Sequence, residues 1–322
     1  MYNIAIIGAG QLGSRHLQGL KLARIPMHIE VVDGSEKSLE TARERYEQVA
    51  PNPSVDGIRY LSSLDALSSE LDLVIVATGS APRRAILEEL LAKKTVRNLL
   101  LEKVLFPGLS DYPAVTTLLE EKGLMKKTWV NCTRRMFEGY KQLRTELVGQ
   151  PDIRYDKSGS DWGMGCNSIH FIDHFMFLTG GEQTPSIDLS GLNPTVHESK
   201  RAGYVEFTGK LRGTVEKSGL FSLESFTGQN FPQSIVIYQG ENRYDIDEAG
   251  DTILKNGEFW NAVGMKYQSA LTNVTAEQIL KENRCELTPY AESARLHLAF
   301  LRPLVEFYNS LTGNNNDHCP IT

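Results

Sequence analysis

The sequence NIAIIGAGQLG at residues 3–13 decides the fold of the first part of the chain. It opens with a short apolar run of the kind that forms a strand with both faces covered. A Gly-x-Gly-x-x-Gly pattern follows directly at Gly8, and a helical pattern of apolar residues runs from Gln11 to Ala23. A second apolar run ends at Asp33, 20 residues after the last of these glycines. The spacing predicts a strand, a tight turn, a helix and a second strand.

The glycines of this turn each have a physical reason in a nucleotide-binding β–α–β unit. Gly8 permits the tight turn, Gly10 lets the backbone approach a pyrophosphate, and Gly13 lets the helix pack closely on the strand. The helix N-terminus adds unpaired N–H groups and partial positive charge for the phosphates. We therefore predict a dinucleotide site instead of a glycine-rich turn that binds nothing. Its expected residues in this segment are Gly8, Gly10, Gln11, Leu12 and Gly13.

Asp33 favours NAD as the dinucleotide. A carboxylate at this position accepts hydrogen bonds from the adenosine ribose, whereas the 2′-phosphate of NADP would meet a like charge. The residues that follow contain no Arg, although Ser35 and Lys37 offer partners for a phosphate. The sequence therefore predicts NAD, with NADP as the alternative.

Strand-like and helical segments keep alternating up to residue 131, which predicts an α/β fold with a doubly wound parallel sheet, a Rossmann domain. The further expected strands are His28–Asp33, Leu73–Thr78, Asn98–Glu102 and Thr128–Asn131, and the further helices are Glu36–Val49, Arg83–Lys93 and Tyr112–Lys122. In such a sheet the loops that follow the strands face the ligand. Thr78 and Gly79 are therefore expected at the cofactor. Arg83 and Arg84 are interpreted as surface charges in preference to substrate contacts.

The pattern changes after about residue 150. Long strand-like runs without intervening helices occupy residues 203–240, which predicts an open, mostly antiparallel sheet in an α+β domain. Helices are expected at Asn167–Leu178 and Tyr290–Leu311. We expect a Rossmann domain at residues 1–131 and a substrate-binding and oligomerisation domain at residues 132–322.

Large apolar residues in these strands predict assembly. The residues are Phe207, Phe221, Leu223 and Phe226. Together they form more apolar surface than one open face of a sheet leaves in water, so a homodimer or homotetramer built on that face is expected. The alternative is that helices of the same chain cover both faces.

Composition and charge exclude several classes of protein. The 322 residues include 34 Lys and Arg against 40 Asp and Glu, a net charge of −6, so no basic surface for nucleic acid is expected. The apolar runs are far shorter than the ~20 residues of a membrane span, and no signal-peptide pattern opens the sequence. The four cysteines show no Cys-x-x-Cys spacing, which disfavours a zinc site and a disulfide framework. We expect a cytoplasmic protein with a small-molecule substrate and neither metal, nucleic acid nor membrane as a partner.

Three further segments carry motifs. Leu100–Val104 ends an expected strand in Glu-Lys, residues 130–137 read VNCTRRMF, and His170–Asp173 is a His-x-x-Asp on an expected helix. In these segments and in its glycine turn, the chain resembles the glucose–fructose oxidoreductase and inositol dehydrogenase family, Gfo/Idh/MocA, over nearly its whole length. The resemblance implies an NAD(P)-dependent dehydrogenase or reductase that acts on a CH–OH group of a sugar, cyclitol or nucleotide sugar.

The resemblance also implies roles for individual side chains. Glu102 and Lys103 are expected at the cofactor, and Lys103 is expected to hydrogen-bond the reacting hydroxyl and stabilise the developing alkoxide. An ion pair between Lys103 and Glu102 is the alternative. His170 is expected as the acid or base, and Asp173 is expected to orient it or to contact sugar hydroxyls. The alternative is a half-buried His bonded to the backbone. Helical spacing places Cys166, His170, Asp173, His174 and Phe177 on one face.

Two positions depart from the family motifs. Val104 replaces the Pro of Glu-Lys-Pro, and Cys166 replaces a carboxylate four positions before His170. The second change removes a group that would share in proton transfer. Two other functions therefore stay open: a protein that binds NAD or a sugar nucleotide without net redox turnover, as a sensor or subunit, and an enzyme that uses tightly bound NAD transiently. A metallopeptidase is disfavoured, because the Asp of the sequence HFIDH is one methylene shorter than the Glu of His-x-x-Glu-His.

Overall fold

The computed structural model describes residues 1–228 and 230–322, which fall into two compact units. Unit 1 comprises Met1–Phe106, Pro113–Asn131 and Lys266–Ala291. Unit 2 comprises Pro107–Tyr112, Cys132–Met265 and Glu292–Thr322. The units are therefore not separated by a single boundary after residue 131, because a late segment of the chain returns to unit 1.

Unit 1 is built around a seven-stranded sheet in the order β19-β8-β7-β5-β1-β2-β3. The strands are β1 (Tyr2–Ile7), β2 (Met27–Val32), β3 (Val55–Leu61), β5 (Leu73–Val76), β7 (Leu99–Leu101), β8 (Thr128–Val130) and β19 (Thr288–Pro289), with a separate pair, β4 (Glu70–Leu71) and β6 (Thr95–Val96). The helices are α1 (Gln11–Leu20), α2 (Glu36–Glu47), α3 (Arg83–Lys93), α4 (Asp111–Glu121) and α7 (Thr272–Glu282), with 3₁₀ turns η1 (Leu64–Ala66), η2 (Met125–Lys127) and η4 (Gln268–Ala270). All pairings in the sheet are parallel except that of β19 with β8.

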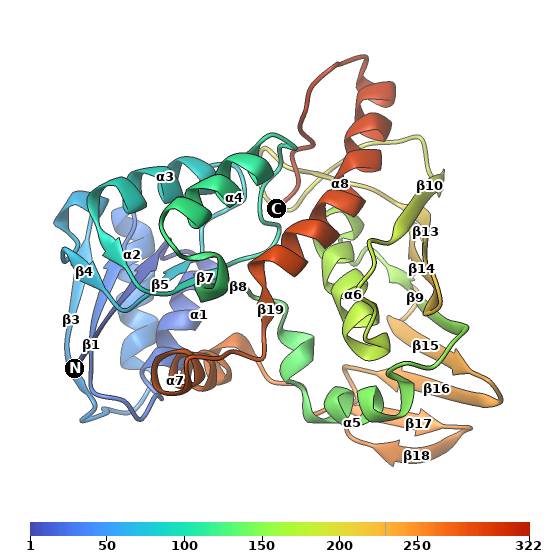
Figure 1. Ribbon diagram of the computed structural model, residues 1–322, viewed down its shortest axis with the longest axis horizontal. Helices are drawn as coiled ribbons and strands as arrows, with labels where there is room; N and C mark the ends of the chain where they lie inside the picture. Colours follow the sequence, from blue (N-terminus) through green and yellow to red (C-terminus); the bar gives the residue numbers. More distant parts are fainter. Residues whose placement is uncertain (229) are drawn as a thin grey trace. The chain divides into compact units, whose positions relative to one another are not determined.

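Helices cover both faces of this sheet, with α3 and α4 on one face and α1 and α7 on the other (Figure 1). The central strands are accordingly buried along their length, as Ile4, Ile6 and Val74 show. This is the reason that they form continuous apolar runs in the sequence. The predicted Rossmann fold is confirmed.

Unit 2 contains an eight-stranded sheet in the order β10-β13-β14-β9-β15-β16-β17-β18. The strands are β9 (Ile153–Ser160), β10 (Ser186–Leu192), β13 (Gly209–Val215), β14 (Gly219–Phe226), β15 (Ser234–Gln239), β16 (Asn242–Asp247), β17 (Thr252–Lys255) and β18 (Glu258–Asn261), with a separate pair, β11 (His197–Glu198) and β12 (Val205–Glu206). The helices are α5 (Glu138–Leu147), α6 (Met164–Thr179) and α8 (Tyr290–Thr312), with a 3₁₀ turn η3 (Thr133–Met136). Among the described residues of this sheet, β9 and β14 pair in parallel and the other neighbouring strands pair antiparallel, so the predicted mostly antiparallel sheet is confirmed.

Three of the four large apolar residues, Phe207, Phe221 and Leu223, are buried under helices, which corrects most of the basis of the predicted assembly. Phe226, at the end of β14, alternates to the other side and packs against Phe231, with ring centroids 4.9 Å apart. The ring of Phe221 packs against Phe175 of α6, with centroids 5.3 Å apart, and Leu223 is fully buried. Phe207 packs against Phe307 of α8 at 5.9 Å. Alternation along β14 therefore directs Phe221 and Leu223 toward the helices and mostly polar side chains to the opposite face.

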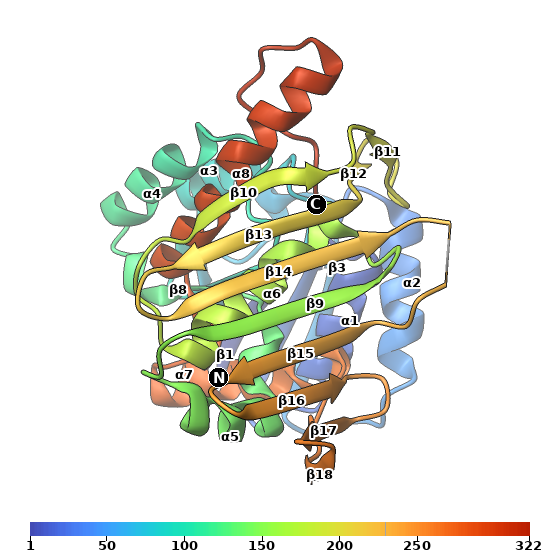
Figure 2. The same ribbon diagram turned by 90° about the vertical axis from the view of Figure 1, so that its right-hand side faces the viewer.

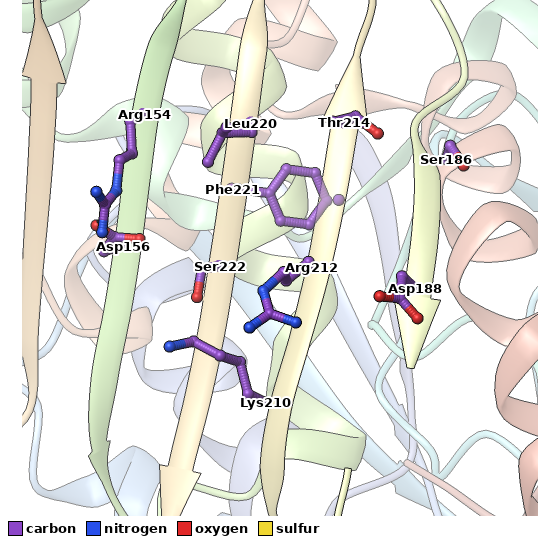
Figure 3. Close-up of a pocket in the computed structure, with 11 residues that line it drawn as sticks. Arg154, Asp156, Ser186, Asp188, Lys210, Arg212, Thr214, Leu220, Phe221 and Ser222 are labelled. Carbon is purple, nitrogen blue, oxygen red and sulfur yellow. The ribbon is translucent and has the colours of Figure 1, made fainter. Parts of the chain in front are cut away.

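The opposite, open face of the sheet is mostly polar. Figure 2 shows this sheet with α5 and α6 behind it. A close-up of the face shows Arg154, Asp156, Lys210, Arg212 and Ser222 around a shallow pocket (Figure 3).

Within the described ranges, no helix is long and apolar enough to cross a membrane.

Candidate active site

The glycine turn of unit 1 contains two glycines that the fold requires and one that it does not require. Gly8 has a φ of +95°, and a Cβ on Gly13 would stand 1.7 Å from the carbonyl oxygen of Gly8. A Cβ on Gly10 would meet no atom within 4 Å. The fold therefore demands Gly8 and Gly13, while the space next to Gly10 is left open at the N-terminus of α1. A bound pyrophosphate fits that space and the N–H groups of the first helical turn.

Asp33 follows β2 and reaches back to this turn. Its Oδ2 accepts a hydrogen bond from the N–H of Ala9 at 2.7 Å, and its Oδ1 accepts one from the N–H of Ser35 at 2.8 Å. Because a carboxylate accepts about four hydrogen bonds, both oxygens retain capacity for ribose hydroxyls. The predicted role of Asp33 is compatible with this geometry.

Two further residues complete the edge of the turn. Thr78 lies against Gly8, since a Cβ on Gly8 would stand 2.9 Å from the Thr78 nitrogen. Arg45 of α2 donates to the side-chain oxygen of Gln11 at 2.6 Å and to Oγ of Ser14 at 2.6 Å. Arg45 therefore orients Gln11, a contact that the sequence pattern did not indicate.

Arg83 is fully buried, so its interpretation as a surface charge is wrong. Its guanidinium donates to the carbonyl oxygens of Thr78, Val104 and Leu105, the last at 2.7 Å. The neighbouring Arg84 pairs with Glu88 at 2.8 Å and is partly exposed. Arg83 thus fixes the turn that follows Lys103, where the family motif has a proline ring.

Glu102 is buried beneath the same strand end. Its Oε1 accepts hydrogen bonds from Nδ2 of Asn131 at 2.5 Å and interacts with Nε2 of His16 at 2.9 Å. Oγ1 of Thr272 in α7 lies 3.0 Å from the other nitrogen of His16. A cofactor contact of Glu102 and the alternative ion pair with Lys103 both stay predictions. Lys103, half-buried, follows this anchored strand.

Helix α6 of unit 2 carries the other candidate residues. It begins after Gly163 and ends before Gly180, both of which have left-handed backbone conformations, with φ of 73° and 70°. Cys166, His170 and Phe177 are half-buried. Their spacing places them on one side of the helix, while the rest of its circumference is mostly buried.

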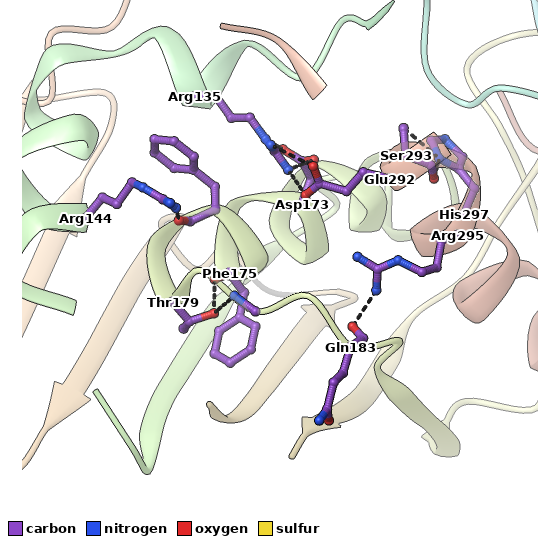
Figure 4. A network of polar contacts seen from close by, with 12 residues as sticks. Arg135, Arg144, Asp173, Phe175, Thr179, Gln183, Glu292, Ser293, Arg295 and His297 are labelled. Atoms are coloured by element: carbon purple, nitrogen blue, oxygen red, sulfur yellow. Dashed lines mark hydrogen bonds and ion pairs between the residues drawn. The ribbon is translucent and has the colours of Figure 1, made fainter. Parts of the chain in front are cut away.

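Asp173 is only 1% exposed and forms a two-pronged ion pair with Arg135 (Figure 4). Nε and Nη2 of Arg135 lie 2.9 and 2.7 Å from its oxygens, and Nη2 also lies 2.6 Å from Glu292 of α8. The ion pairs join α6 to η3 and α8. This arrangement suits a residue that positions the helix, including the turn that bears His170.

His174 is buried and neutral. Burial and the nearby Arg134 lower its pKa to about 3. Its Nδ1 lies 3.1 Å from the hydroxyl of Tyr155, and the ring of Tyr140 is 4.0 Å away. Of the two histidines in this motif, His170 is therefore the one suited to acid–base chemistry.

Comparison with known proteins identifies the first part of the chain. A family model described as "Oxidoreductase family, NAD-binding Rossmann fold", GFO_IDH_MocA, matches residues 2–131. The N-terminal domain is a Gfo/Idh/MocA domain. The resemblance and the NAD-binding character predicted from the glycine turn are thus confirmed. A relative from Salmonella typhimurium, the putative oxidoreductase YceM, is 29% identical over 133 residues, which are 39% of this chain and 42% of that protein. The match thus spans less than half of the relative's length.

Solved structures with the same fold span nearly the whole chain. UDP-N-acetylglucosamine 3-dehydrogenase GnnA from Acidithiobacillus ferrooxidans is 16% identical with a TM-score of 0.66 and covers 94% of this chain and 96% of its own. An Agrobacterium radiobacter oxidoreductase in complex with NAD+, L-tartaric acid and magnesium is 14% identical with a TM-score of 0.70 and covers 98% of each chain. Biliverdin reductase from Synechocystis is 14% identical with a TM-score of 0.67 and covers 97% and 99%. At these identities the likeness shows the shared fold.

The departure from the Gfo/Idh/MocA motif at Cys166 has a structural counterpart. Sγ of Cys166 lies 2.7 Å from Oε1 of Glu206 in β12, and Oε2 of Glu206 accepts from the N–H of Gly165 at 2.5 Å. The motif has a carboxylate at the position of Cys166. In this chain Glu206, on a different element, supplies a carboxylate beside that position. Sequence reasoning missed Glu206 because 40 residues separate it from Cys166 and no motif marks the pair.

Replacing Gly10 by Val tests the glycine turn. We expect the affinity for NADH to fall at least about tenfold, or about 1.4 kcal/mol, with little change in melting temperature, because the added side chain occupies only the open space. Gly13→Val is the matched control and should lower the melting temperature, since its Cβ collides with the Gly8 carbonyl. Fluorescence titration with NADH and thermal unfolding measure both. Undiminished NADH affinity of folded Gly10→Val would place the cofactor elsewhere.

Proposed function

We propose that this chain is an NAD(P)-dependent oxidoreductase, with NAD preferred, that transfers a hydride between nicotinamide and a hydroxyl or keto carbon. The proposed substrate class is a sugar, cyclitol or nucleotide sugar, to which the dehydrogenase GnnA lends support. The observation that carries the proposal is the order of strand ends in unit 1. The glycine turn follows β1, Thr78 follows the adjacent β5, and Lys103 follows β7, the next strand. A primary amine thus stands on the same sheet edge as the dinucleotide turn.

Each candidate residue has its own part in the proposed reaction. Bound NAD supplies the hydride acceptor or donor. Oxidation of a hydroxyl also releases a proton, and the ammonium of Lys103 donates a hydrogen bond to the oxygen that becomes a carbonyl. His170 accepts the proton in oxidation and returns it in reduction. Asp173, held by Arg135, keeps α6 and the His170 turn in place.

One experiment separates this proposal from the two other functions. The protein is incubated with NAD+ or NADP+ and a panel of sugars, cyclitols and nucleotide sugars while nicotinamide absorbance is followed. A net change supports the proposal. A changed sugar without net absorbance change indicates transient use of tightly bound NAD. Cofactor binding without either change indicates a sensor or subunit, a function that the replacement of the motif carboxylate by Cys166 favours.

Titration with NADH and NADPH tests the cofactor preference. NADPH that binds tenfold more tightly than NADH would overturn the role proposed for Asp33.

We also propose a homodimer or homotetramer in the cytoplasm, assembled through the open face of the unit 2 sheet. This face carries both signs of charge, with Arg154, Arg212, Asp156 and Asp188 around the partly exposed Leu220. Such a surface is able to pair with itself about a two-fold axis. Light scattering at low salt should give the mass of two or four chains, and screening by salt should shift the equilibrium toward monomer. A monomer at micromolar concentration and low salt contradicts this assembly.

A further inference from the structure

Lys157 is a buried ammonium on the helix-covered face of the unit 2 sheet. It lies on β9 and is only 2% exposed. Its Nζ donates to the carbonyl oxygen of Ser158 at 3.0 Å and to Oε1 of Gln233 at 3.2 Å. It also lies 5.4 Å from the ring centroid of Trp162 and 5.2 Å from that of Phe171. Because Phe171 follows His170, this ammonium lies beside the turn of α6 that carries the proposed acid–base group.

No carboxylate oxygen of the described residues lies within 4.0 Å of the Lys157 ammonium, the limit for an ion pair. Glu248 is the carboxylate that acts electrostatically on Lys157, and its own charge is already matched by Arg134. Nε and Nη2 of Arg134 lie 2.7 and 2.6 Å from the Glu248 oxygens, and the hydroxyl of Tyr140 donates to Oε1 at 2.7 Å. Burying a charge without a counter-ion costs folding free energy, so a buried charge usually has an oppositely charged partner in the protein or in a ligand.

A cavity of about 530 Å³ opens next to this ammonium. Ile235, Ile246 and Met265 supply apolar walls, and the polar and charged groups of its lining come from Lys157, Gln233, Ser234, Asp247 and Glu248. Apolar walls with a few convergent polar groups are characteristic of small-molecule sites. The cavity is formed entirely by residues of unit 2.

We propose that this cavity receives a carboxylate or phosphate group of the substrate, with the Lys157 ammonium as its counter-ion. This inference rests on the proposed function, because it takes the ligand of the cavity to be the substrate. It narrows the substrate class to acidic sugar derivatives. The side-chain amide of Gln233, which already contacts the Lys157 ammonium, provides a further hydrogen bond to an oxygen of such a group. Two carboxylates, Asp247 and Glu248, also line the cavity. The charge of Glu248 is matched by Arg134, and Asp247 lies on the side of β16 opposite Ile246 and is exposed.

The affinity for an acidic ligand should depend on pH in a defined direction. Burial lowers the pKa of Lys157 to about 8, with Glu248 opposing and Arg134 adding to that effect. His174, the titratable group on the facing helix, is neutral throughout this range. The ammonium is therefore present below pH 8 and is lost above it. Binding of an acid should weaken as the pH rises through this value and should be accompanied by proton uptake near it.

Calorimetric binding to the NAD+-loaded protein tests the proposal. The probes are glucuronate for a carboxylate, glucose 6-phosphate for a phosphate, and glucose as the neutral reference. We expect one acidic probe to bind at least about tenfold more tightly than glucose at pH 7, and this preference to be lost at pH 9.5. In Lys157→Met the preference should be lost at both pH values. Lys210→Met, which removes a lysine on the open face, should retain it.

The outcomes distinguish this inference from the proposed function. Lys157-dependent binding of an acid without any redox turnover upholds the cavity and refutes the oxidoreductase. Turnover of neutral sugars with no preference for acids in wild type refutes the cavity and upholds the oxidoreductase. The folding of Lys157→Met is checked by thermal unfolding, where removal of an unmatched buried charge should keep or raise the melting temperature. If that variant fails to fold, the pH dependence of acid binding by the wild-type protein tests the role of Lys157. A preference for the acid that persists at pH 9.5 would then refute that role.

Discussion

Lys103→Ala is expected to lower kcat by roughly 10²–10⁴-fold while the affinity for NADH stays nearly unchanged. The amine is proposed to act on the reacting oxygen, so its loss removes an interaction that strengthens in the transition state. The glycine turn, in contrast, is held by the hydrogen bond from the Ala9 N–H to Asp33 and by the close approach of Gly13 to Gly8. Steady-state kinetics with the substrate found in the panel, together with NADH titration, measure the two quantities.

Two companion variants locate the proton transfer. His170→Ala should cause a loss comparable with that of Lys103→Ala, because the thiol of Cys166 is a poor replacement for the motif carboxylate. Cys166→Ser keeps the size of the side chain and removes its acidity. Unchanged turnover in this variant supports a Lys–His pair, whereas a large loss would indicate that the thiol and Glu206 share in the proton transfer. Full activity in all three variants would show that the chemistry lies elsewhere.

Asp173→Ala is expected to lower the free energy of unfolding by about 3 kcal/mol or more, because it leaves the buried guanidinium of Arg135 with one carboxylate where it had two. Because the ion pair joins α6 to η3, activity should fall as well. Urea unfolding followed by circular dichroism measures the change in stability.

Asp56→Ala is the control for this variant, since Asp56 is an exposed residue of β3 in unit 1. Its stability should stay within about 0.5 kcal/mol of wild type. An Asp173→Ala protein that keeps full stability but loses turnover would assign Asp173 to direct contact with the substrate.

The sequence patterns predict unit 1 better than unit 2, for a physical reason. In unit 1 most strands are apolar on both faces, and the backbone of the turn itself requires its glycines. Short segments of sequence are therefore enough to predict these strands and the turn. Strand β9 escaped detection because a charged residue, Lys157, occupies one of its buried positions and disguises the alternation. Residues 266–291 return to unit 1 through β19, which is only two residues long and has no sequence signal of its own.

The same contrast applies to the candidate site. Gly8, Gly10, Gly13 and Asp33 are recognisable because their spacing is fixed by one β–α–β unit. The partners that hold the site are distant in sequence: 21 residues separate Arg83 from Val104, and 86 separate His16 from Glu102. No local pattern encodes such contacts, so Arg83 looked like an exposed charge at the start of a helix.

The hydrogen bonds of Arg83 couple the motions of two segments. One guanidinium holds the carbonyl of Thr78 after β5 and those of Val104 and Leu105 after β7. Neither segment is able to open alone without leaving the buried cation short of acceptors, so the cost of local unfolding is shared between them. The loop beside the glycine turn and the turn that carries Lys103 therefore behave as one cooperative unit. We expect amide hydrogens in the two segments to exchange with solvent through a common opening event, and a ligand that orders one segment to order the other as well.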